Sequence, residues 1–311
     1  MAEPYKDVRL VLGDPDPAFG KTVSSAVFPL GLRDISVCID GERLRDATAA
    51  TVDVVACDTS LPKLDFRSFA QDVRHGKVGQ NPFVILIATV LDEAAAKAEH
   101  IPECGIDEMI AKPVNPLLLV RRIGMLAKDR KPFVLTPGYV GPSRRAARRN
   151  DGSDDAVVAV PNTLRARVVE QKSDGAVDGL VVAGRTTLNQ GIAASGVNVI
   201  ARLVRQLGER QSEGAGIEEF RRLLGALARM ASQVASEHRD SGSSRNIPPI
   251  AERMRRLASR AEAAPARPPQ AELDLLARLS DAANVALADG TGAADAVPEI
   301  VAVVDSYLAR S

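Results

Sequence analysis

Short apolar runs alternate with longer amphipathic stretches between residues 8 and 128. Such alternation is typical of repeated βα units, which build a parallel sheet with helices on both faces. The run over residues 83–88 is apolar throughout, as a strand covered on both faces should be. The pattern therefore predicts an α/β domain with a doubly wound, five-stranded parallel sheet. We expect strands near residues 8–13, 35–39, 52–57, 83–88 and 107–111, and helices near residues 17–30, 41–50, 65–75, 91–100 and 115–128.

The rest of the chain divides into two segments that differ in composition and in the spacing of their apolar residues. Residues 131–184 are rich in proline, glycine and arginine, and their apolar residues do not recur at a regular spacing. We therefore interpret this segment as a linker. In residues 185–311 apolar side chains recur every three or four positions, as in the stripe from Val197 to Leu207. This spacing predicts a separate all-α bundle of four or five helices, following a first domain over residues 1–130.

Charge and composition exclude several classes of protein. The chain has 40 basic and 40 acidic residues, so no global field favours nucleic acid or an anionic membrane. No apolar run approaches the roughly 20 residues that a membrane span needs, and no leader opens the chain, so we expect neither insertion nor secretion. Three cysteines without a CxxC pair suit a reducing compartment, and the expected location is the cytoplasm.

Polar side chains follow four of the predicted strands. Asp14 follows the first, Asp58 the third and Thr89 the fourth, and Lys112 follows the fifth. Parallel strands end at one edge of the sheet, where such folds do chemistry. A carboxylate that accepts a phosphoryl group needs a fixed cation and a hydrogen-bond donor around the transferred oxygens, and Asp58, Lys112 and Thr89 meet these needs. Asp14 could hold Mg²⁺ together with Asp58.

Residues 8–128 resemble the CheY-like receiver domain of bacterial two-component response regulators, which has a flavodoxin-like sheet. The resemblance covers about 40% of the chain. It rests on the joint spacing of three motifs, Asp58-Thr59-Ser60-Leu61-Pro62, Ala88-Thr89 and Ala111-Lys112-Pro113. It implies that Asp58 is the phosphoacceptor, with Mg²⁺ bound, and that a histidine kinase or phosphotransfer protein supplies the phosphoryl group.

Two positions depart from the family's pattern. The family has adjacent acidic residues after the first strand, and the second of them, usually a direct Mg²⁺ ligand, is Pro15 here. Asp16 could replace that ligand, or it could instead cap the first helix, with Asp14 acting alone beside Asp58 and water. The other departure is Met109, which stands where the family often has an aromatic ring that turns inward on activation.

These residues leave two functions open. The first is a response regulator, not an enzyme, that is phosphorylated on Asp58 and signals through protein contacts of the helical region. The alternative is a pseudo-receiver scaffold that binds its partner without phosphorylation, with Asp58 as a turn former, Thr89 as a helix cap and Lys112 as a surface lysine.

The helical region itself gives few functional signals. Residues 185–311 contain sixteen arginines and fifteen acidic residues, a balance that disfavours a DNA-binding tail, so we expect an output protein or a homodimer and no nucleic acid. His238 lacks the small and basic neighbours of a phosphotransfer histidine. We interpret the cluster from Arg144 to Arg149 as part of a solvated linker. The less favoured alternatives are a patch that binds phosphate or a partner, and the arginine motif of a PilZ domain, which binds cyclic dinucleotides. No glycine-rich phosphate-binding loop precedes a suitable helix, so the sequence contains no motif for nucleotide-dependent kinase activity.

Overall fold

The computed structural model describes residues 5–144, 156–237, 246–288 and 296–310. The chain divides into two compact units, Met1–Arg185 and Thr186–Ser311.

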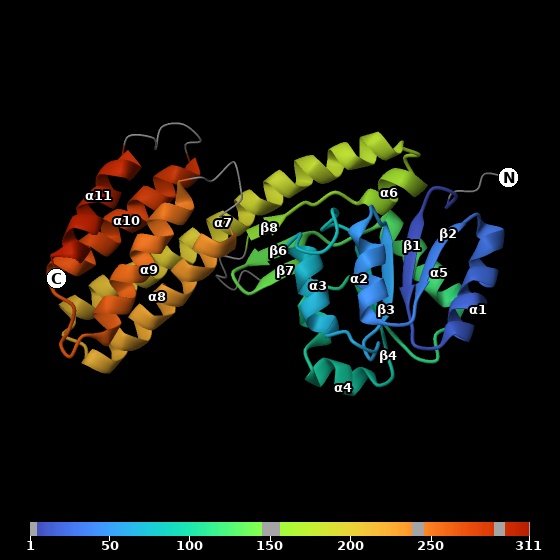
Figure 1. The fold of residues 1–311 in the computed structure, drawn as a ribbon, viewed down its shortest axis with the longest axis horizontal. Helices are drawn as coiled ribbons and strands as arrows, with labels where there is room; N and C mark the ends of the chain where they lie inside the picture. The colour runs from blue at the N-terminus through green and yellow to red at the C-terminus, as the bar shows by residue number, and fades with distance from the viewer. Residues whose placement is uncertain (1–4, 145–155, 238–245, 289–295, 311) are drawn as a thin grey trace. The chain divides into compact units, whose positions relative to one another are not determined.

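The first unit contains a five-stranded parallel sheet in the order β2-β1-β3-β4-β5 (Figure 1). Its strands are β1 (Arg9–Gly13), β2 (Asp34–Cys38), β3 (Val54–Asp58), β4 (Ile85–Val90) and β5 (Glu108–Ala111). The connecting helices are α1 (Pro17–Val27), η1 (Phe28–Leu30), α2 (Gly41–Ala49), α3 (Phe66–Arg74), α4 (Glu93–Ala98), η2 (Ile101–Cys104) and α5 (Pro116–Lys128). The predicted doubly wound α/β sheet is thereby confirmed.

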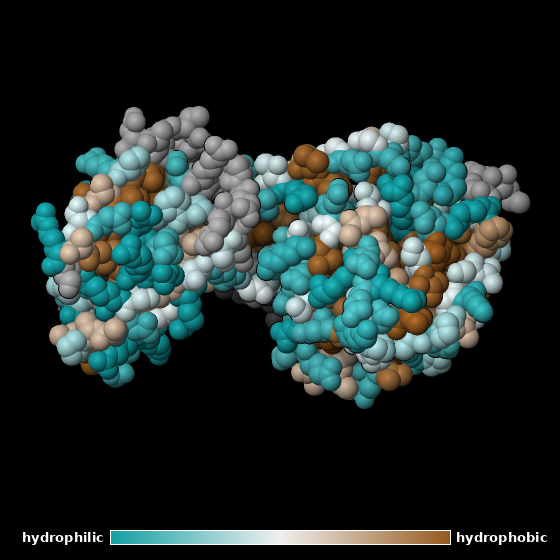
Figure 2. All heavy atoms as spheres, in the orientation of Figure 1, coloured by the Kyte–Doolittle hydropathy of each residue, from teal (hydrophilic) through white to brown (hydrophobic). Residues whose placement is uncertain are grey.

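Successive side chains of the central strands pack into separate cores on the two faces of the sheet. On β3, Val55 and Cys57 pack with the core beneath α2 and α3, whereas Val54 and Ala56 pack with the core beneath α1 and α5. Every residue of β3 and β4 is buried, which explains why the sequence of β4 is apolar up to Thr89. On the face that Figure 2 shows, hydrophilic residues cover much of the surface, with apolar patches between them.

The helices of this sheet begin at side chains that cap them. Asp or Asn precedes each of α1 to α5, and its side-chain oxygen accepts a backbone N–H of the first turn; the caps are Asp16, Asp40, Asp65, Asp92 and Asn115. A cap of this kind stabilises a helix by about 1 kcal/mol. Because Asp92 caps α4, Thr89 is not the cap of that helix.

Regular structure occupies much of residues 131–184, so the interpretation of this segment as a linker needs correction. Strands β6 (Phe133–Thr136), β7 (Tyr139–Pro142) and β8 (Ala156–Val158) form an antiparallel sheet, and α6 (Thr163–Val168) follows. The helix α7 (Asp174–Ser212) also begins here, before the predicted start of the helical region. The prolines and glycines belong to short strands and turns, which leave no periodic apolar signal.

Phe133 anchors this segment in the first unit. Its side chain is fully buried, and its ring centroid lies 6.3 Å from that of Phe83. The guanidinium groups of Arg74 and Arg130 lie 5.0 Å and 4.9 Å from the same ring. The Phe133 ring is therefore packed against the first unit, and Leu164 of α6 lies in the core beneath α1 and α5.

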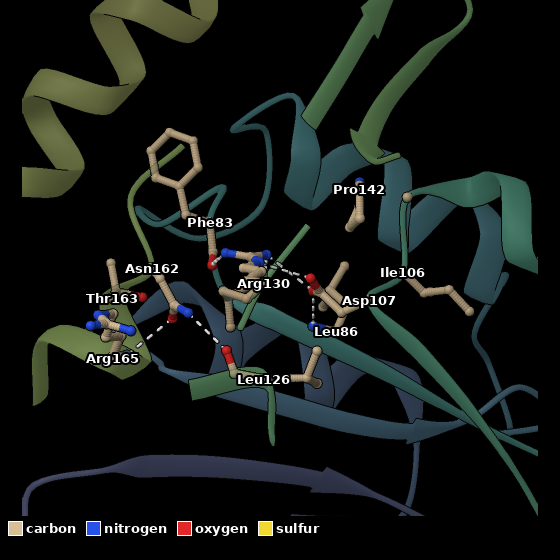
Figure 3. Close-up of polar contacts among 12 residues, drawn as sticks. Phe83, Leu86, Ile106, Asp107, Leu126, Arg130, Pro142, Asn162, Thr163 and Arg165 are labelled. Atoms are coloured by element: carbon tan, nitrogen blue, oxygen red, sulfur yellow. Dashed lines mark hydrogen bonds and ion pairs between the residues drawn. The ribbon is translucent and has the colours of Figure 1, made fainter. Parts of the chain in front are cut away.

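The buried carboxylate of Asp107 accepts hydrogen bonds from Arg130 and from the backbone N–H of Leu86 (Figure 3). Asp107 accepts hydrogen bonds of 2.8 Å from both Arg74 and Arg130. Burial raises the pKa of Asp107, but the two guanidinium charges outweigh it, so the pKa lies below its usual value. Farther along the segment, Asn162 donates to the Leu126 carbonyl oxygen at 2.8 Å.

The second unit is helical. It contains the later part of α7 with α8 (Ile217–Glu237), α9 (Ile247–Ala263), α10 (Gln270–Ala288) and α11 (Ala296–Ala309). These helices share one apolar core, which includes Phe220, Leu227, Met254, Leu276 and Val304. The prediction of an all-α C-terminal region is confirmed. Among the described residues, no helix is long and apolar enough to cross a membrane.

Substitution of Phe133 tests whether residues 131–168 are part of the first unit. We expect Phe133→Ala to lower the free energy of unfolding by about 3 to 5 kcal/mol, because it removes a buried ring from a packed core. Phe28→Ala is the matched control, since Phe28 is 58% exposed, and it should cost far less. Urea unfolding of both variants measures the difference. Equal, small losses would contradict the packing described.

Candidate functional site

Four predicted site residues meet at the carboxyl edge of the five-stranded sheet. Asp58 ends β3 and lies beside Thr89 of β4 in the strand register. Asp14 follows Gly13 of β1, which pairs with the residue before Asp58. Lys112 follows β5, and its backbone N–H donates to the Val90 carbonyl oxygen at 2.7 Å. The register of the parallel strands thus brings the four residues together.

The ammonium of Lys112 joins the two carboxylates. Its Nζ donates to Asp14 Oδ2 at 2.8 Å and also donates to Asp58 Oδ2. The side chains of Asp14 and Asp58 are only 2% and 3% exposed, so both carboxylates are shielded from water. One cation therefore contacts two buried carboxylates.

Backbone and hydroxyl donors hold the other carboxylate oxygens. Asp58 Oδ1 accepts from Ser60 N at 2.8 Å and from Ser60 Oγ at 2.7 Å. Asp14 Oδ1 accepts from Asp16 N at 2.9 Å. Both are local bonds to the residue two positions on, as in an Asx turn. The contact of Ser60 was missed from the sequence, although an Asp followed two residues later by Ser was a signal for it.

These contacts set the charge states at the site. Burial raises the pKa of Asp58, but the hydrogen bonds from Lys112 and Ser60 outweigh burial and leave this pKa below its usual value. Burial lowers the pKa of Lys112, but its bonds to Asp14 and Asp58 outweigh burial and leave that pKa above its usual value. Asp58 is therefore an ionised carboxylate at neutral pH, and Lys112 is a cation.

Thr89 contributes an unsatisfied hydroxyl. The residue is 2% exposed, and within the described part of the chain its Oγ1 has no hydrogen-bond partner. Leaving a buried hydroxyl unpaired costs about 1 to 3 kcal/mol. An anionic oxygen attached at Asp58, on the neighbouring strand, would supply a hydrogen-bond acceptor.

Comparison with known proteins gives distant matches to the first unit. No family model matches the chain. The probable transcriptional regulator ycf27 of Cyanidium caldarium is 26% identical over 115 residues, which are 37% of this chain and 44% of that protein. The chain thus spans less than half the length of this relative.

Two solved structures are also similar. The receiver domain of the Francisella response regulator 1452 is 20% identical, with a TM-score of 0.35, over 39% of this chain and 98% of that one. The Thermotoga maritima OmpR/PhoB homologue DrrB is 17% identical, with a TM-score of 0.37, over 57% of this chain and 88% of that one. The sheet itself decides the fold, because the strand order β2-β1-β3-β4-β5, with helices on both faces, is the CheY-type order. The first unit has the receiver fold.

Mg²⁺ is the metal that a receiver would be expected to bind, and the donor set tests whether it fits. Mg²⁺ prefers six oxygens in near-octahedral geometry. Pro15 offers no side-chain oxygen, and the exposed Asp16 carboxylate accepts from Ala18 N at 2.9 Å as the cap of α1. Both oxygens of Asp14 and of Asp58 already accept hydrogen bonds from the protein. Among the described residues, no three His, Cys, Asp or Glu side chains gather into a metal-binding group. The residues present therefore do not complete a magnesium site at this edge of the sheet.

Other residues considered from the sequence lie away from this chemistry. Met109 pairs in register with Ala88 of the receiver sheet and packs against the core beneath α2 and α3. Cys57 is fully buried, and burial raises its pKa, so it fills the core as an inert thiol. Arg144 donates to the Ile106 carbonyl oxygen. His238 and residues 145–149 of the arginine cluster lie outside the described residues.

The pKa of Asp58 tests the role of Lys112. Because the pKa of Asp58 is lower in the folded chain, ionised Asp58 stabilises the fold at pH values above the pKa of an unfolded aspartate, about 3.9. This stabilisation is lost as the pH falls through the pKa of Asp58 in the folded chain. Lys112→Met should raise the Asp58 pKa, because burial remains while the hydrogen bond and the charge of the ammonium are lost. Titration followed by carboxyl-carbon NMR measures the change, with Lys97→Met as the exposed control. An unchanged Asp58 pKa in Lys112→Met would contradict the geometry.

Proposed function

We propose that the chain is a response regulator whose Asp58 accepts a phosphoryl group. The observation that carries the proposal is the buried Thr89 hydroxyl without a partner, beside an ionised Asp58 that already contacts Lys112. A phosphoryl group on Asp58 would place oxygens within reach of both donors. This combination of nucleophile, cation and donor suits phosphoryl transfer better than a purely structural site.

The transfer is a displacement at phosphorus. Asp58 Oδ2 forms the new O–P bond as the bond from phosphorus to the donor's nitrogen breaks, and the nitrogen keeps the electron pair. The Lys112 ammonium then exchanges its contact with Asp58 Oδ2 for a phosphoryl oxygen, and Thr89 Oγ1 donates to another. The resemblance to receivers favours a histidine kinase or a phosphotransfer protein as donor. No step passes through a metal ion, since the donor set does not complete a site for one.

The output is proposed to be contact between proteins rather than catalysis. The second unit contains a bundle with one apolar core and charged outer faces, and such helices commonly associate with other helices. Its balanced charge gives no support for nucleic-acid binding.

A pseudo-receiver scaffold is the second candidate. The observation that favours it is the set of hydrogen bonds that occupies every carboxylate oxygen of Asp14 and Asp58, together with Pro15 at the usual ligand position. In that case the Lys112 bridge would be a permanent structural contact, and the partner would bind without phosphorylation.

Chemical phosphorylation separates the two candidates. We expect incubation of the full chain with acetyl phosphate to add one phosphoryl mass in intact mass spectrometry, and Asp58→Asn to abolish the addition. Asp92→Asn is the matched control, because Asp and Asn cap helices equally well, and it should be phosphorylated like the parent chain. No added mass, or an addition that survives Asp58→Asn, would favour the scaffold and refute the first candidate.

Magnesium titration tests whether the oxygen ligands present are too few to bind Mg²⁺. We expect millimolar Mg²⁺ to produce no saturable heat in isothermal titration and no rise in the melting temperature, because Pro15 removes a carboxylate from the site. Pro15→Asp should restore saturable binding by adding that carboxylate. Tight binding to the parent chain would show that Asp14 and Asp58 suffice with water, and would overturn this account of the metal.

A further inference from the structure

A cavity of about 230 Å³ lies in the first unit between the end of α5 and the residues that join β8 to α6. Four of the described side chains that line it are basic, namely Lys128, Arg130, Lys131 and Arg165. Among the same lining residues, Asp129 alone is acidic. A concave site with this excess of one charge attracts ligands of the opposite sign. The cavity is therefore suited to an anion.

Arg130 belongs to a buried cluster that has more positive than negative groups. The side chains of Arg74, Arg130 and Asp107 are 0%, 3% and 1% exposed. Both guanidinium groups bond to the Asp107 carboxylate, and Figure 3 shows the contact of Arg130 with it. Burial and the charge of Arg130 lower the pKa of Arg74 to about 10, so Arg74 is still a cation at neutral pH. Within the described residues neither arginine pairs with a second carboxylate, so one buried positive charge is in excess.

Two lysines add to this excess at the cavity. Lys128 and Lys131 are both exposed, and in the part of the chain that the structure describes neither side chain forms an ion pair or a hydrogen bond. Arg165 differs, because its Nε lies 3.2 Å from a carboxylate oxygen of Glu170. If Asp129 offsets one of the two lysines, the other lysine and the excess guanidinium leave about two positive charges to be balanced.

The rest of the lining limits the size and the chemistry of a ligand. Pro132, Ala159 and Val160 form an apolar wall. The side-chain N–H of Asn162 already donates to a backbone carbonyl oxygen of α5, and its oxygen accepts from a backbone N–H of α6. The volume is below the roughly 300–1,000 Å³ of sites for drug-sized ligands. The cavity thus fits a small anion with a short carbon body better than a nucleotide.

We propose that this cavity binds a phosphate dianion, either free or as the monoester of a small phosphorylated compound. A dianion matches the two positive charges in excess, whereas a single carboxylate would balance only one of them. Lysine ammonium groups are common phosphate ligands because they are compact point charges, and Arg130 supplies a fixed positive charge beside them. The proposal does not depend on phosphorylation of Asp58.

Isothermal titration of the full chain at pH 8 tests the site, with inorganic phosphate and glycerol 3-phosphate as the two probes. We expect saturable binding, which the double variant Lys128→Met with Lys131→Met should weaken at least tenfold by removing two cations. Lys21→Met is the matched control, since Lys21 is an exposed lysine of α1 away from this lining, and it should leave the affinity unchanged. Tighter binding of glycerol 3-phosphate would identify a phosphorylated compound as the ligand, and equal binding would identify phosphate itself.

Amide NMR locates the bound anion. Phosphate should shift the backbone amide signals of residues 128–131 and 159–160, and the double variant should lose these shifts. Because both lysines are exposed, the double variant should keep the melting temperature of the parent chain. No saturable binding of either probe, binding indifferent to the double variant, or shifts confined to the strand ends around Asp58 would overturn the proposal.

Discussion

Two buried carboxylates at one edge of a sheet repel each other when both are ionised, and the Lys112 ammonium donates a hydrogen bond to each of them. At an effective dielectric constant near 20, charges a few ångströms apart interact by about 4 kcal/mol, so the lysine offsets a repulsion that would otherwise be large. The same carboxylates shape their surroundings through their second oxygens. Asp58 holds the loop at Ser60, and Asp14 holds the turn that leads to Asp16 and α1. The site and the loops around it are therefore one set of hydrogen bonds, positioned by the register of β1, β3, β4 and β5.

Much of the first unit could be predicted from local sequence. Apolar runs identify the strands, and the polar residues after those runs must lie at the same edge of a parallel sheet, so Asp14, Asp58, Thr89 and Lys112 could be placed together. Pro17 after Asp16 correctly suggested the cap of α1. The unpaired state of the Thr89 hydroxyl could not be predicted, because it depends on every neighbour packed around a buried side chain.

Residues 131–168 show where local reasoning fails. Strands of three or four residues with proline and glycine between them give no period to detect. Contacts between residues far apart in the sequence hold these strands in place. The Phe133 ring lies against the guanidinium groups of Arg74 and Arg130. Asp107 binds both arginines, which are 33 and 23 residues away from it in the sequence. Removing one partner from such a buried ionic group typically costs about 3 to 5 kcal/mol, so the segment and the receiver sheet stabilise each other. A basic and proline-rich composition alone could not distinguish this arrangement from a solvated linker.

The central claim is that Asp58, Lys112 and Thr89 form a site for a phosphoryl group. Beryllofluoride imitates a phosphoryl group on a carboxylate and can be followed by fluorine NMR without turnover. We expect protein-bound fluorine signals in the full chain that disappear in Asp58→Asn and shift in Thr89→Ala, where the hydroxyl donor is lost. Absence of any Asp58-dependent signal, with or without Mg²⁺, would contradict the account and leave the Lys112 bridge as a structural contact alone.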